Sequence, residues 1–397
     1  MRIILFTLLA VGLIQAQSIH QLIDQSIKSH PSLKAIQHRL SAMDERIEGS
    51  QNFSNPDLSL TINDIQFGDP VNRGLEPMQF HALNFKQKFP WFGKLDARKT
   101  FTQAQKSVIF DSYEAAKVKL ALEIRMTAYT IKELEERIRI VNRYKGVAQQ
   151  NIDLYTSYAS TQKTSHASSM SASLLLTTVK IRAERYKAIL KTQKAKLKYL
   201  VQGKVSSISD SLRMTKPQAL GKYLSKLKNN PNYHMKLSQQ HVADANKAIQ
   251  DLSINPDPYV QLGYYNRQEF PDYATISIGA SLPLYGTEKL AAEAARKEVL
   301  AASSASLDYR YSLKSEIEIM HAKLIEAYHI YYIIQDESLP QLEHMFELTQ
   351  SSIQSGGDLF AYTTLLEQKL TLEEQRTSIK AEYLRTQAKL KSLTGEL

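Results

Sequence analysis

An internal repeat organises this chain of 397 residues and limits the folds that are open to it. Ordered landmarks recur at near-constant spacing, which indicates a duplication. The matched landmarks are Pro31 with Pro231, Asn-Pro-Asp at 55–57 with 255–257, FPWFG at 89–93 with LPLYG at 282–286, and Gly203 with Gly395. We therefore expect two structural repeats, residues 17–203 and residues 217–397, joined by a linker at 204–216.

Each repeat is predicted to contain the same order of helices. A helix of about 35 residues comes first, at 18–52 or 217–252, and an unbroken helical stretch of about 67 residues follows later, at 94–161 or 287–354. A second helix of about 35 residues closes each repeat near its final glycine. At 1.5 Å per residue the long helix would span roughly 100 Å, so two short helices can stack along it as a helical hairpin.

Two short segments of alternating polarity separate the first helix of each repeat from the long one. Apolar and polar residues alternate with a period of two, which predicts strands. The apolar positions are Leu58, Leu60 and Ile62, then Leu83, Phe85 and Phe89, and in the second repeat Ala274, Ile276, Ile278, Ala280 and Leu282; residues 259–266 are rich in aromatic side chains. Each segment has about ten residues, the length of a tilted transmembrane strand.

Four strands cannot close a barrel, and open sheet edges are not tolerated in lipid. Closure therefore requires further copies of the chain, and three copies would supply twelve strands. The fold class that we predict is an α+β membrane protein with long helices and a β-barrel, with four strands per protomer and twelve in a trimer.

The first residues are expected to be a secretory signal peptide. Arg2 supplies a positive charge, residues 3–14 form an apolar run, and polar Gln17 follows Ala16. The run is too short to cross a bilayer, so we expect it to be removed, with residues 1–16 as the signal peptide.

The chain offers no pattern of an enzyme, a cofactor site or a metal site. It contains no cysteine, its ten histidines are dispersed, and its nine methionines form no cluster. Neither a glycine-rich phosphate loop nor a nucleophile elbow occurs. The net charge is +10, but basic residues are mixed with acids along the chain, which argues against nucleic-acid binding. We expect no catalytic residue, no cofactor and no bound metal.

With these features in place, the chain resembles the TolC-type outer-membrane efflux proteins over nearly its whole predicted mature length. The resemblance is carried by the repeated helix–strand–strand–helix layout, the Asn-Pro-Asp before the strands, and FPWFGKL after them; the motif positions are Pro90, Trp91, Gly93, Pro283 and Gly286. FPWFGKL looks most like the heavy-metal branch of the family. Many members of that branch carry a lipidated N-terminal cysteine, which this chain lacks.

The resemblance implies a long α-helical barrel in the periplasm that carries a β-barrel in the outer membrane. It also implies a pore aperture at one helical hairpin. In the family, acidic residues near this turn surround the periplasmic opening. Here Gly356 and Gly357 interrupt the helix, Asp358 follows them, and Glu367 lies further along the next helix. Three copies of each acid around one axis would attract cations. Asp358 can equally serve as a helix cap, and Glu367 can equally be a solvated surface charge.

These observations predict the outer-membrane channel of a tripartite efflux system, a passive exit duct for metal cations or small toxic compounds. The expected partners are two further copies in a homotrimer, a periplasmic adaptor protein, an inner-membrane pump of the RND type, and outer-membrane lipid. Two alternatives stay open at this point. One is the exit duct of a type I protein secretion system, and the other is an exported coiled-coil scaffold without a pore.

Overall fold

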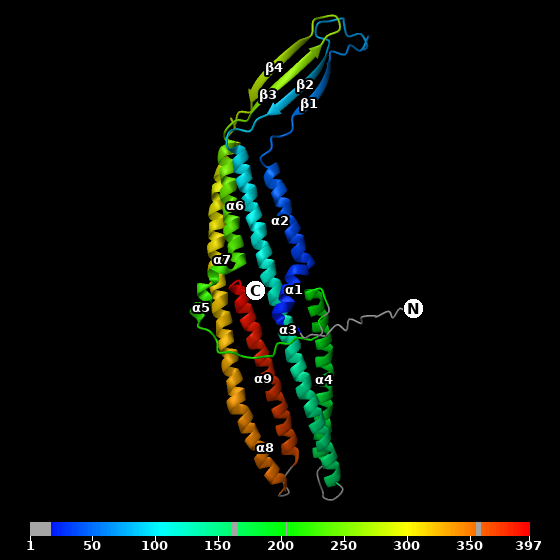
Figure 1. The fold of residues 1–397 in the computed structure, drawn as a ribbon, viewed down its shortest axis with the longest axis vertical. Helices are drawn as coiled ribbons and strands as arrows, with labels where there is room; N and C mark the ends of the chain where they lie inside the picture. Colours follow the sequence, from blue (N-terminus) through cyan, green and yellow to red (C-terminus); the bar gives the residue numbers. More distant parts are fainter. Residues whose placement is uncertain (1–16, 160–165, 204, 206, 355–358) are drawn as a thin grey trace, which may run out of the picture. The chain divides into compact units, whose positions relative to one another are not determined.

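The structure is a computed structural model that describes the chain apart from residues 1–16, 160–165, 204, 206 and 355–358. The predicted signal peptide lies outside the described residues. Two compact units are present: one comprises Met1–Lys34, Glu114–Asn230 and Tyr311–Leu397, and the other comprises Ala35–Tyr113 and Pro231–Arg310. Each unit takes segments from both halves of the sequence, and Figure 1 shows the elements along the chain. No described helix has an apolar stretch long enough to cross a bilayer.

The four strands form one antiparallel sheet within the second unit. The strands are β1 (Asp57–Asn63), β2 (Phe80–Lys88), β3 (Pro258–Asn266) and β4 (Tyr273–Ala280), and they lie in sequence order, as Figure 1 shows. The sequence therefore located all four strands to within about two residues, although each is somewhat shorter than the predicted ten. Hairpins join β1 to β2 and β3 to β4, and the β2·β3 ladder joins the two repeats.

Large apolar side chains on the first and last strands are exposed in the single chain. Leu58 and Leu60 on β1 are 69% and 73% exposed, and Ile276 and Ile278 on β4 are 74% and 78% exposed. These residues belong to the apolar face that the alternation predicted. A contiguous apolar band on an isolated chain indicates a surface that is covered by a membrane or by another protein chain.

The segment between β1 and β2 is held by one buried arginine. Arg73 is buried, and its guanidinium donates to the carbonyl oxygens of Asn63, Asp64 and Phe80. Gln79, fully buried, accepts from the backbone N–H of Leu75 at 2.8 Å. Two buried side chains therefore bond several backbone groups in and beside this connection.

The first helix of each repeat is broken where the sequence predicted it to be continuous. The expected helix at 18–52 is two helices, α1 (Ile19–Ser29) and α2 (Pro31–Gly49). The expected helix at 217–252 is α5 (Leu220–Ser225), a short 3-10 turn η1 (Leu227–Asn229) and α6 (Pro231–Ser253). A residue before proline is disfavoured in the helical conformation. Accordingly His30 and Asn230 both adopt extended backbone, with ψ of 126° and 120°.

The long helices agree more closely with the sequence. The first is α3 (Lys94–Ala159), and the second comprises α7 (Thr287–Tyr332), a π-helical turn η2 (Ile333–Ser338) and α8 (Leu339–Gln354). Pro340 explains the π-helical turn, because proline has no N–H for the ordinary helical bond and its ring displaces the preceding turn. The closing helices are α4 (His166–Val201) and α9 (Leu359–Leu393).

The core of the first unit includes a seam between α3, α4 and α9. Buried residues recur at three and four positions, for example Val141, Tyr144 and Ala148 on α3, and Val179 and Ala183 on α4. Leu366 and Leu370 of α9 complete the same cluster. This periodicity is that of helices packed along their length. In the second unit the buried helical residues are mostly small, such as Ala97, Ala245 and Ala295, which lets helices approach closely.

Candidate functional site

The motif of the first repeat forms the junction between β2 and α3. Phe89 continues the sheet, since its N–H donates to the carbonyl of Pro258 at 2.8 Å. Gly93 has φ of +84°, a left-handed conformation that glycine adopts without a steric penalty. Its carbonyl then accepts from Ala97 at 2.9 Å and starts the helix. The motif therefore changes an extended chain into a helix within a few residues.

Asp257, from the second repeat, binds this junction. Its Oδ1 accepts from the backbone N–H of Trp91 at 2.8 Å and from Nζ of Lys94 at 2.7 Å. Lys94 also donates to the carbonyl of Asn255 at 2.7 Å, and its side chain is only 12% exposed. Burial by itself raises the pKa of Asp257, but the bonds from Lys94 and Trp91 outweigh it and leave the pKa below the ordinary value. Asp257, in the Asn-Pro-Asp segment of the second repeat, thus binds the FPWFG motif of the first repeat through hydrogen bonds and an ion pair.

The motif of the second repeat has the same backbone form with different contacts. Gly286 has φ of +76°, and its carbonyl accepts from Leu290 at 3.1 Å at the start of α7. Pro283 lies before it, and the N–H of Leu284 turns back to the carbonyl of Leu282 at 3.0 Å. Tyr285 is 96% exposed. Within the described chain, no carboxylate binds this second junction as Asp257 binds the first.

We expect the Asp257 contact to be lost in acid. Because its folded pKa lies below the ordinary 3.8, the carboxylate stabilises the fold above about pH 3.8, and this contribution disappears as pH falls through the lowered pKa. Trp91 is the only tryptophan in the chain, so its fluorescence reports on this junction alone. The emission should be constant between pH 7 and about pH 4 and change below it. Asp257→Asn should remove that transition, whereas Asp69→Asn, an exposed control, should keep it; an unaltered transition in Asp257→Asn would contradict the assignment.

The predicted aperture is only partly described. Gly356, Gly357 and Asp358 lie outside the described residues, so the sharp turn proposed for them stays a prediction. Glu367 is exposed on α9 and lines an open groove of about 540 Å³ together with residues of η2 and α8. The other residues lining this groove are Ser338, Gln341, Leu342, Met345, Thr364, Gln368, Thr371 and Leu372.

A polar cluster that sequence reasoning missed lies on α9, within the seam of the first unit. Oε2 of Glu374 pairs with Nη1 of Arg182 at 2.7 Å, and its Oε1 accepts from the hydroxyl of Tyr186 at 2.7 Å. The Glu374 side chain is 10% exposed, so both contacts are shielded from water. Burial and the bond to Glu374 raise the pKa of Tyr186, which therefore remains a neutral donor. Arg182 and Tyr186 are one helical turn apart on α4, which lets one carboxylate bind both.

The adjacent carboxylate faces the other helix of the hairpin. Glu373 pairs with Arg143 of α3, and burial together with the nearby Glu373 raises the pKa of Tyr144. Tyr155 of α3 and Thr363 of α9 share a buried hydroxyl contact of 2.9 Å. The α3–α4 hairpin is therefore connected to α9 by several polar contacts. We call Glu374, Arg182, Tyr186, Glu373 and Arg143 the helix clamp.

A signal for the helix clamp existed in the sequence. Glu373 and Glu374 come three and four residues after Leu370, a spacing that places both on the same side of the helix as Leu366 and Leu370. A carboxylate in that position requires a cationic partner, because an isolated buried charge is costly. The sequence cannot say which of its many Arg and Lys residues supplies it.

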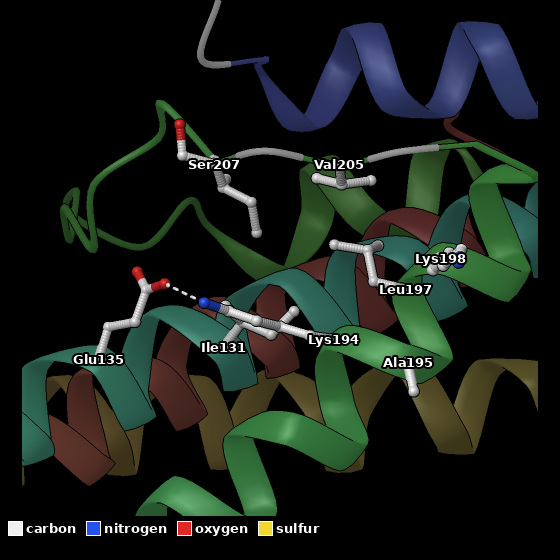
Figure 2. Close-up of a pocket in the computed structure, with 9 residues that line it drawn as sticks. Ile131, Glu135, Lys194, Ala195, Leu197, Lys198, Val205 and Ser207 are labelled. Atoms are coloured by element: carbon white, nitrogen blue, oxygen red, sulfur yellow. Dashed lines mark ion pairs between the residues drawn. The ribbon is translucent and has the colours of Figure 1, made fainter. Parts of the chain in front are cut away.

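A further groove lies on the first unit beside the inter-repeat segment. Figure 2 shows it between α3, α4 and the described residues Val205, Ser207 and Ile208. Its volume is about 450 Å³. Its polar feature is the ion pair between Lys194 and Glu135 at 3.5 Å, and its walls include Ile131, Leu197 and Val205. Across the described residues no three His, Asp or Glu side chains are grouped so that they could hold a metal ion. The groove offers aliphatic contact and one solvated ion pair.

The fold was compared with known proteins. Neither a protein-family model nor a curated protein matches the chain. Solved structures do match over almost its whole length. The outer membrane protein VceC from Vibrio cholerae matches with a TM-score of 0.78 at 15% identity, covering 95% of this chain and 96% of VceC. The Neisseria gonorrhoeae MtrE outer membrane channel, in its open state, matches with a TM-score of 0.78 at 13% identity, covering 95% of this chain and 89% of MtrE. CusC, a protein that forms a transmembrane channel, matches with a TM-score of 0.75 at 11% identity, covering 96% of this chain and 92% of CusC.

Proposed function

We propose that this chain, which has the fold of the TolC-type outer-membrane efflux channels, is the outer-membrane exit duct of an efflux system and works as a passive channel rather than as an enzyme. The observation that carries the proposal is the sheet of four strands, whose first and last members are both open edges with exposed apolar faces. Such a sheet is stable in a membrane only when further copies close it.

The proposed assembly is a homotrimer with a twelve-stranded barrel in the outer membrane and helices extending into the periplasm. Three sheets of four strands give an even strand number and a lumen wide enough for a duct. The proposed partners are a periplasmic adaptor protein and an inner-membrane pump, of the RND type, which supplies the energy. Outer-membrane lipid would cover the apolar band of the strands.

The proposed cargo is metal cations or small toxic compounds. The support for metal cations is the resemblance of FPWFGKL, residues 89–95, to the heavy-metal branch. A wide duct selects little by itself, so the pump would determine the cargo. If the neighbouring genes encoded a type I secretion ATPase instead, the duct would serve protein export.

The channel is tested by single-channel conductance of the purified protein in planar bilayers. We expect a trimer in detergent that dissociates on heating, and discrete conductance steps after reconstitution. A stable folded monomer without conductance would contradict the proposal and would favour the exported coiled-coil scaffold. Light scattering of the same preparation supplies the oligomeric state, so that the two measurements describe one sample.

The aperture is proposed to carry rings of carboxylates from Asp358 and Glu367. Three copies of each acid around the axis would attract cations and bind divalent ions. Replacing both with alanine should raise basal conductance and reduce cation preference and divalent block, as measured by reversal potential in asymmetric salt. Asp153→Ala, on the exposed surface of α3, is the control and should change neither property. Unchanged selectivity in the double variant would leave these carboxylates as a helix cap and a surface charge.

A further inference from the structure

The two strand–helix junctions are equivalent by the internal repeat, but only one of them is complete in a single chain. At the first junction, the carboxylate of Asp257 binds the N–H of Trp91 and the ammonium group of Lys94. The repeat aligns Asp257 with Asp57, Trp91 with Leu284 and Lys94 with Thr287. The second junction therefore has a backbone donor, the N–H of Leu284, in the place of Trp91. The chain also has a carboxylate, Asp57, that corresponds to Asp257.

Asp57 cannot reach the second junction of its own chain. It begins β1, at one edge of the sheet, whereas Leu284 follows β4 at the other edge. Three strand spacings separate the two edges, roughly 14 Å. Asp57 is exposed, and no described group of its own chain bonds its carboxylate. The N–H of Leu284 meanwhile closes only a three-residue turn, a weak local arrangement.

The β2·β3 ladder shows how two such edges pair. It is antiparallel, aligns Lys88 with Tyr259, and extends beyond the strand through the bond from Phe89 to Pro258. Applying the same register to β4 and to β1 of a second copy places apolar residues opposite one another. The resulting pairs are Leu282 with Leu58, Ala280 with Leu60, and Ile278 with Ile62. A shift of one residue would place apolar residues opposite polar ones. The alternation therefore supports this register over one shifted by a single residue.

We propose that Asp57 of one copy completes the β4–α7 junction of the next copy by accepting a hydrogen bond from the N–H of Leu284, close to the hydroxyl of Thr287. The contact replaces the weak turn at Leu284 and repeats three times around the proposed trimer. It rests on the trimeric channel proposed above and adds the strand register and the residues that join the copies. Since Thr287 stands where Lys94 stands in the first junction, the contact between copies has no ammonium partner.

The register is tested by disulfide cross-linking, for which a chain without cysteine is a clean background. In the proposed register Ser59 of one copy lies opposite Ser281 of the next, so Ser59→Cys/Ser281→Cys should form disulfides between copies. Oxidised samples should contain covalent dimer and trimer on non-reducing gels. Within one chain the two cysteines lie too far apart to join. The matched control, Ser59→Cys/Ser277→Cys, is displaced by four residues and should stay monomeric on the gel.

Other cross-linking results would overturn the proposal. A cross-link from Thr61→Cys/Ser281→Cys, with none from the first pair, would mean a register shifted by two residues and no contact from Asp57 to Leu284. No cross-link in a preparation that is still trimeric by light scattering would overturn the register and leave the channel in place. Absence of any trimer would overturn both the inference and the proposed function.

The contact itself is tested by the rate of trimer dissociation in detergent. Asp57→Ala should speed dissociation about tenfold, as expected for the loss of a hydrogen bond to a charged group. Asp57→Asn keeps the acceptor oxygen and should stay within about threefold of wild type. Asp69→Ala, an exposed carboxylate between β1 and β2, should leave the rate unchanged. A wild-type rate in Asp57→Ala would overturn the contact even where the cross-link forms.

Discussion

Ile278→Arg is expected to abolish most of the folded, membrane-inserted protein, whereas Ser277→Arg is expected to keep a large fraction of it. Ile278 lies on β4 opposite Val260 and is 78% exposed in the single chain, on the face that we assign to lipid. Arginine on the lipid face costs about 2–4 kcal/mol near the midplane of the bilayer, so the folded population should fall by a factor of roughly 30 or more. Ser277 lies on the opposite face of the strand, which we assign to the lumen, where arginine would meet water.

The measurement is the yield of heat-modifiable trimer in purified outer membranes at equal expression. A second matched pair, Ile276→Arg and Thr275→Arg, should behave in the same way. Ile276 is on the same face of β4 as Ile278, and Thr275 is on the same face as Ser277, because residues two apart on a strand share a face. Equal yields within each pair would show that the strands face differently from this assignment, or that the apolar band is not in contact with lipid.

Glu374→Ala should loosen the helix clamp and increase the basal conductance of the channel. The substitution leaves Arg182 and Tyr186 without their shared partner in a site where Glu374 is 10% exposed. Removing one partner of a shielded charged pair costs about 1–3 kcal/mol when the other partner retains some access to water. Local opening of α9 away from α4 should therefore become about 5- to 150-fold more frequent.

Amide hydrogen exchange measures that opening directly. Exchange should accelerate around residues 176–186 of α4 and 366–377 of α9 and stay unchanged in the strands. Glu382→Ala, an exposed acid on the same helix, is the control and should leave both exchange and conductance at wild-type values. If exchange accelerates while conductance does not, the clamp stabilises the helices without restricting the pore; if neither changes, the clamp is not holding α9.

Several features of this protein could be determined from the sequence because they depend on local patterns. Strand positions followed from the two-residue alternation, and the long helices followed from apolar periodicity that continues through Gly146 in the first and Pro340 in the second. The breaks at His30 and Asn230 could have been predicted too, because each precedes a proline and proline acts on its neighbour by local sterics. The π-helical turn before Pro340 has a local cause of the same kind, although its form was not predictable.

Other features needed the tertiary structure, because they depend on which distant segments meet. The repeat indicated that Asp57 and Asp257 are equivalent, but only the order of the strands decided that Asp257 binds the motif of the other repeat while Asp57 lies at an open edge. Likewise, Glu373 and Glu374 were visible as two adjacent acids, yet the choice of Arg143 and Arg182 as partners came from the packing of α9 against the α3–α4 hairpin. Local sterics and periodicity are encoded within a few residues, whereas the pairing of charges across helices is set by register between segments about 200 residues apart, which no local pattern specifies.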